Sequence, residues 1–160
     1  MSIDNTFLSS TELADGGAGL ICFGNIPIDR HNLENYNNAV LDPRNPWDPV
    51  AAFAPAIRAA KSRGAICLPQ LQFPGRQVPE FLNKHPKSAS DVQLEPCLNK
   101  TYGKPTALTR VEIKELVGRY VWASEVLAKA GADGIIVSFI PLATQPATDY
   151  CSCTPPTGTS

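Results

Sequence analysis

Residues 65–77, Ala65-Ile66-Cys67-Leu68-Pro69-Gln70-Leu71-Gln72-Phe73-Pro74-Gly75-Arg76-Gln77, decide the fold. The stretch begins with a short apolar run, which is typical of a strand buried on both faces of a parallel sheet. The polar Gln70 stands at the C-terminal end of this run and is followed by Pro-Gly-Arg. Parallel α/β folds, α/β barrels among them, place ligand-binding groups at the carboxyl ends of such strands. The stretch therefore predicts a buried strand over 65–71 and a candidate ligand site beside it.

Two further apolar runs, 19–24 and 135–137, also read as short buried strands. The segments 25–45 and 74–107 are polar and without a clear period, so we expect long loops, with a short helix near 78–82. Long loops in compact domains are often functional. A chain of 160 residues predicts one domain.

A helical pattern precedes each of the three expected strands. The first helix ends over residues 9–16. The second is opened by Asp48-Pro49, and Pro55 should either kink it or move its start later. The third begins at the capping box Thr109-Arg110-Val111-Glu112 and shows one apolar face; that face is Ile113, Leu116, Val117, Tyr120, Ala123, Leu127 and Ala130. Helices alternating with strands predict parallel strands with right-handed crossovers.

Composition limits the classes of function. The formal net charge of −1 offers no electrostatic basis for binding nucleic acid or an anionic membrane. No apolar run is long enough to span a bilayer and no signal peptide is evident, so a cytoplasmic protein is expected. The five cysteines are an odd number, so no disulfide framework is expected. Cys22 and Cys67 read as small core residues, and Cys151 and Cys153 lack a second ligand pair, so no metal site is predicted.

Five motifs follow one another between residues 10 and 137: Gly16-Gly17-Ala18-Gly19-Leu20-Ile21, then Gly24-Asn25 with Ile28-Asp29-Arg30, then Gln70-Leu71 with Pro74-Gly75-Arg76-Gln77, then Leu108-Thr109 with Glu112-Ile113, and Ala130-Gly131-Ala132-Asp133-Gly134-Ile135. In this order they resemble the old yellow enzyme family, whose members are FMN-dependent NAD(P)H:flavin oxidoreductases built on a (β/α)8 barrel. The resemblance implies an α/β fold, with about three βα units of a partial barrel over residues 10–138. Residues 1–9 are expected to be a flexible N-terminus and residues 139–160 a disordered tail.

The resemblance also implies a chemistry and candidate residues. NAD(P)H would reduce FMN, and the reduced flavin would pass hydride to an activated C=C bond, as in an enone, or to a quinone. Gln70 matches the family glutamine on the flavin pyrimidine edge, and Gly24 matches the small residue where backbone approaches the ring. Arg76 matches the arginine of a His-x-Gly-Arg loop whose first position is Phe73 here. Arg76 and Asn25 are therefore candidates for substrate or loop contacts.

The catalytic groups of the family are not evident. The family pattern places a histidine pair, or histidine and asparagine, after the strand at 135, whereas the only histidines are His31 and His85. Tyr36 and Tyr102 could donate protons, but nothing places them at a site, so the catalytic residues stay unassigned.

The chain is therefore expected to be truncated, by a shifted reading frame or mis-splicing, with little independent activity. One alternative is a non-catalytic half-barrel remnant or interaction protein that self-associates through open sheet edges. The other is an unrelated small α/β binding protein of open-sheet type.

Overall fold

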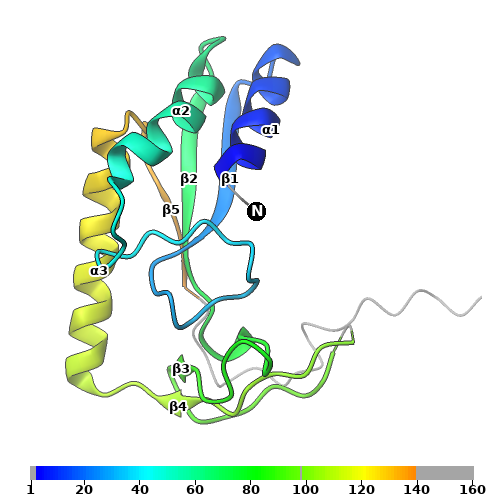
Figure 1. Ribbon diagram of the computed structural model, residues 1–160, viewed down its shortest axis with the longest axis vertical. Coiled ribbons are helices and arrows are strands. Elements are labelled where there is room, and N and C mark those ends of the chain that lie inside the picture. The colour runs from blue at the N-terminus through cyan, green and yellow to red at the C-terminus, as the bar shows by residue number, and fades with distance from the viewer. Residues whose placement is uncertain (1–2, 98, 140–160) are drawn as a thin grey trace, which may run out of the picture.

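The computed structural model of the chain describes residues 3–97 and 99–139. Its main sheet has three parallel strands in the order β1-β2-β5, formed by Leu20–Pro27, Ile66–Phe73 and Ile136–Phe139. Three helices, α1 (Ile3–Asp15), α2 (Pro49–Lys61) and α3 (Arg110–Lys129), alternate with these strands along the chain (Figure 1). This is the predicted α/β fold with parallel strands.

The helices cover one face of the sheet and bury its core there. Ile21 of β1 and Cys67 and Leu71 of β2 are almost completely buried against Phe53 and Ile57 of α2 and Leu127 of α3; these six side chains belong to one hydrophobic cluster. Burial of large apolar side chains contributes about 1.5–3 kcal/mol each, so this cluster is the main source of stability. Among the described helices, none is long and apolar enough to cross a membrane. The cytoplasmic location stays a prediction.

Local signals explain where the helices begin. The Asp48 carboxylate accepts hydrogen bonds from the backbone N–H groups of Val50 and Ala51, so α2 starts at Pro49 and Pro55 does not move its start. Thr109 and Glu112 form the predicted reciprocal capping box of α3. The first helix starts at Ile3, well inside the stretch expected to be flexible.

The expected apolar face of α3 was partly wrong. Leu116, Ala123 and Leu127 are buried as predicted, but Ile113 and Val117 are 47% and 57% exposed. Helix α2 and strand β2 pack on the side of α3 that carries the buried residues, and Val117 lies outside that contact. The spacing of apolar residues along a helix shows which residues can be buried together, but not how much of the helix surface the neighbouring elements cover.

Three other expectations need correction. The segment 74–107 is not a plain loop, because it contains a 3-10 helix, η1 (Gly75–Gln77), and the two-stranded parallel pair β3 (Lys87–Ser88) and β4 (Thr106–Ala107). Such two-residue strands are too short to leave a periodic pattern. Cys97 is disulfide-bonded, which an odd cysteine count could not reveal. Cys22 is exposed rather than part of the core, because it stands on the sheet face without helices, whereas Cys67 is buried.

Asp42 holds the long loop between β1 and α2 in place. Its fully buried carboxylate accepts hydrogen bonds from the backbone N–H of Arg30 and from the Arg44 guanidinium, at 3.1 and 2.8 Å. Burial raises the pKa of Asp42, but the hydrogen bonds from Arg44 and Arg30 outweigh it and hold that pKa well below its ordinary value.

We predict that Asp42→Asn lowers the free energy of unfolding by about 2 kcal/mol at pH 7. The lowered pKa means that the charged carboxylate stabilises the fold above its ordinary pKa and loses that effect as pH falls. The difference between wild type and variant should therefore shrink below roughly pH 4. Urea unfolding at pH 7, 5 and 3 measures it, with the exposed Asp91→Asn as control; an equal loss at pH 3 would contradict this account.

Candidate functional site

None of the described helices covers the second face of the three-stranded sheet, and we call this face the open face. It carries Leu20 and Cys22 of β1, paired in register with Ile66 and Leu68 of β2. Leu20 and Ile66 are 53% and 50% exposed, whereas their chain neighbours Ile21 and Cys67 are buried. Because side chains alternate along a strand, Gln70 lies on this same face.

The structure brings Gly24 and Gln70 together on the open face. A β-carbon on Gly24 would lie 2.9 Å from Cβ and 3.0 Å from the backbone oxygen of Gln70, closer than side chains normally approach. Both residues, with Cys22, line a cavity of about 190 Å³ that α1 borders through Ser10 and Leu13. The two residues that the family resemblance places at a flavin are thus neighbours, and their contact with a flavin stays a prediction.

Asn25 lies next to this pair but is used within the protein. The Gly24–Asn25 peptide bond is cis. The Asn25 side-chain amide donates to Glu34 Oε2 at 2.6 Å, and the Gln72 amide donates to the same oxygen at 3.1 Å. Gln72 is buried, and its Oε1 has no hydrogen-bond partner within the described part of the chain. The Glu34 carboxylate therefore accepts hydrogen bonds from two side-chain amides near the C-terminal ends of β1 and β2.

Sequence reasoning missed Glu34 and Gln72. Gln72 could have been found, because in the run Gln70-Leu71-Gln72 strand alternation puts both glutamines on one face. Glu34 lies within a long loop that carries no period, so the sequence contained no signal for its contact with a residue 38 positions away.

The other predicted candidates lie elsewhere. Arg76 is buried at 8% exposure within η1. Phe73 is buried on the helix-covered side of β2, together with Leu71. Tyr36 is 71% exposed, and the backbone of Tyr102 bridges to Pro79 in the segment before α3. Neither tyrosine lines the cavity beside Gln70.

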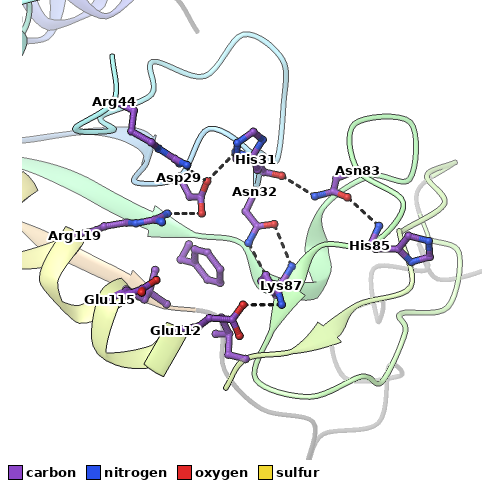
Figure 2. Close-up of a pocket in the computed structure, with 13 residues that line it drawn as sticks. Asp29, His31, Asn32, Arg44, Asn83, His85, Lys87, Glu112, Glu115 and Arg119 are labelled. Atoms are coloured by element: carbon purple, nitrogen blue, oxygen red, sulfur yellow. Dashed lines mark hydrogen bonds and ion pairs between the residues drawn. The ribbon is translucent and has the colours of Figure 1, made fainter. Parts of the chain in front are cut away.

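Both histidines line a different and larger cavity, of about 310 Å³, between the loop after β1, the segment 83–87 and the first half of α3 (Figure 2). Asn83 connects their loops, since it donates to the backbone oxygen of His31 and accepts from the backbone N–H of His85, both at 2.9 Å. Phe73, Leu108 and Leu116 supply its apolar lining.

Ion pairs shape this larger cavity. Asp29 contacts Arg119 of α3 at 2.5 Å and Arg44 at 3.2 Å, and Lys87 contacts Glu112 at 2.7 Å. The hydrogen bond from Lys87, helped by the backbone N–H of Thr109, lowers the pKa of Glu112 to about 2. Among the described residues, no three His, Cys, Asp or Glu side chains gather as metal ligands, and Cys151 and Cys153 lie outside the described part.

The two described free thiols differ in environment. Cys22 is exposed and lines the cavity beside Gly24 and Gln70. Burial, reinforced by the nearby Asp133 carboxylate, raises the pKa of Cys67 to about 11. At neutral pH only the thiolate reacts, so Cys22 is the accessible thiol of this pair.

Comparison with known proteins relates this geometry to a family. No family model matches the chain. The NADH-dependent flavin oxidoreductase nadA of Aspergillus parasiticus is 35% identical over 123 residues, which are 75% of this chain and 28% of that protein. The NADH-dependent flavin oxidoreductase iliE of Hypocrea jecorina is 27% identical over 144 residues, covering 76% of this chain and 34% of the relative.

The solved structures that resemble this chain include enzymes of the same kind as these relatives. The old yellow enzyme homologue from Zymomonas mobilis superposes with a TM-score of 0.67 at 25% identity, over 82% of this chain and 38% of that one. The chain therefore resembles the N-terminal part of old yellow enzyme homologues and of NADH-dependent flavin oxidoreductases. Morphinone reductase in complex with tetrahydroNAD shares the fold, with a TM-score of 0.65 at 22% identity over 82% of this chain.

The chain spans about a third of the length of the curated relatives that it matches. In fold, the chain corresponds to the N-terminal part of such an α/β barrel, with β1, β2 and β5 as adjacent parallel strands. The open face corresponds to the interior of such a barrel, since the helices of an α/β barrel lie outside its strands. Gly24 and Gln70 accordingly lie in the C-terminal halves of β1 and β2, on the face that corresponds to the barrel interior.

We predict that Gly24→Ala lowers the free energy of unfolding by about 1–3 kcal/mol, because the new methyl group would overlap Gln70 and force the strands apart. Gly19→Ala is the matched control, since nothing lies within 4 Å of a β-carbon there. Urea unfolding of both variants measures the difference, and equal stability would refute the close approach of β1 to Gln70.

Proposed function

We propose that this chain is the flavin-binding N-terminal part of an FMN-dependent NAD(P)H oxidoreductase that reduces activated C=C bonds. The juxtaposition of Gly24 and Gln70 beside a cavity on the open face carries the proposal. The names of the curated relatives support a flavin and NADH. The choice of FMN, of NADH or NADPH, and of an enone or quinone substrate belongs to the proposal.

The residues present suit a flavin edge. Among the described residues the Gln70 side-chain amide has no hydrogen-bond partner, so its donor and acceptor are available to a ligand. An amide suits the flavin pyrimidine edge, which offers alternating donors and acceptors. The absence of a β-carbon at Gly24 lets the backbone approach a planar ring closely. A cavity of about 190 Å³ accommodates one edge of such a ring rather than all of it.

When bound, FMN would supply the hydride-transfer chemistry, and the protein would supply binding and orientation. Gln70 would fix the ring orientation through its amide. Glu34, held by Asn25 and Gln72, would keep the adjoining strand ends in place. Neither His31 nor His85 lines this cavity, so they do not provide the histidine pair of the family. We therefore expect little turnover from this chain alone.

A second function is favoured by one observation. The exposed apolar side chains Leu20 and Ile66 on the open face are large enough to drive association. The alternative is therefore a non-catalytic half-barrel that self-associates or pairs with another protein through this face or its strand edges.

We predict that the chain binds FMN, and that Gln70→Ala weakens this binding about tenfold, the effect of one lost hydrogen bond in a partly buried site. Flavin fluorescence titration measures both affinities. Gln93→Ala is the matched control, because Gln93 is an exposed glutamine that bonds only the backbone of Tyr102 among the described residues. An absence of FMN binding by the wild-type chain would overturn the proposal and favour the non-catalytic half-barrel.

A second prediction uses the exposed thiol. Because Cys22 lines the cavity with Gly24 and Gln70, FMN should slow its alkylation by iodoacetamide severalfold. Mass spectrometry of the digested protein measures the modification at Cys22, and riboflavin tests whether the ring alone protects. Equal labelling with and without a saturating flavin would place the flavin away from this cavity.

A further inference from the structure

We propose that the larger cavity, between the first half of α3 and the loop after β1, binds a small organic acid whose carboxylate sits on an apolar body. This goes beyond the proposed function, because the cavity is lined by Phe73 of β2 rather than by Gln70. The two residues are three positions apart on one strand and therefore face opposite sides of the sheet.

The first argument is an inventory of hydrogen-bonding groups. The guanidinium of Arg119 has five N–H donors, and in the described part of the chain one contact, to Asp29, uses its Nη1. The ammonium of Lys87 has three donors, and Glu112 is its one partner there. Donors remain available to a ligand at both residues.

The facing acceptors are mostly occupied. Asp29 Oδ1 accepts from the backbone of His31 and from Arg44, and Oδ2 accepts from Arg119. The two oxygens of Glu112 accept from Lys87 and from the Thr109 backbone. Apart from Glu115, the carboxylates that line this cavity are occupied, whereas Arg119 and Lys87 keep unused donors, and this favours a carboxylate over an amine. The planar fork of Arg119 suits a carboxylate in particular.

The apolar lining and the volume of the cavity define the rest of the ligand, beyond its carboxylate. Phe73 and Leu116 are buried, and with Leu108 they present an apolar surface to the cavity. The volume of about 310 Å³ is at the lower end of the range for small-molecule sites. An aromatic or short aliphatic body of a few carbon atoms fits this space, with its acid group among the charged side chains.

The carboxylate of one lining residue disfavours the binding of an anionic ligand. Glu115 also lines the cavity and has no hydrogen-bond or ion-pair partner among the described residues. Three cations, Lys87, Arg44 and Arg119, are thus balanced by three carboxylates. Removing the charge of Glu115 takes one negative charge away from the cavity, so it should strengthen the binding of an anion. A gain in affinity of this kind cannot result from loss of structure.

The test is an NMR titration of the full ¹⁵N-labelled chain with sodium benzoate, and with benzyl alcohol as the uncharged probe of similar shape. Benzoate should shift the amide signals of residues 85–88 and 112–119 with a Kd of about 1 mM, typical of so small a ligand. Benzyl alcohol should bind about tenfold more weakly, since it lacks the charge that Arg119 and Lys87 recognise.

Two variants of α3 test whether benzoate binding depends on the charge at this cavity. Glu115→Gln should tighten benzoate binding roughly threefold to tenfold. Glu125→Gln, an exposed acid on the same helix outside this cavity, should leave the affinity unchanged. Equal binding of benzoate and benzyl alcohol, shifts confined to other regions, or no gain in Glu115→Gln would each overturn the proposal. Added FMN should not compete, so failure here and failure of the flavin proposal give different results.

Discussion

The parallel pairing of β1 with β2 is the interaction on which the other features depend. The two strands run in register from Leu20 opposite Ile66 to Phe23 opposite Pro69, and the register shifts before Ile26. Gly24 lies within this irregular step, where any side chain would collide with Gln70. The backbone geometry at Gly24 therefore sets how closely the two strand ends approach and where the Gln70 amide stands.

Charge pairs then position the segments that the sheet does not hold directly. Asp42 fastens the loop after β1 through Arg44, and Asp29 in the same loop reaches Arg119 on α3. Lys87 and Glu112 connect β3 to the first turn of α3. Long polar segments without hydrophobic period thus acquire defined positions, because buried or half-buried carboxylates need specific partners.

These two kinds of interaction produce two different surfaces. On the open face, Gly24 and the Gln70 amide, which has no hydrogen-bond partner among the described residues, line one cavity. On the other side of β2, apolar residues and a network of cations and carboxylates enclose a separate cavity. The separation follows from strand alternation, because neighbouring residues of β2 cannot contribute to the same face. Ligand binding at one surface can therefore be altered by mutation without direct contact with the other.

The sequence by itself determined the order of the three main helices and strands and the capping of α2 and α3, and the family resemblance singled out Gly24 and Gln70. Those features depend on local chemistry, on alternation within a strand, or on motifs that a family shares. The tertiary structure alone decided the contact of Glu34 with Gln72, the ion pair of Asp29 with Arg119 and the exposure of Val117. The residues of that ion pair are 90 positions apart. No local pattern encodes such a contact, because it depends on how the completed sheet and helices bring distant loops together.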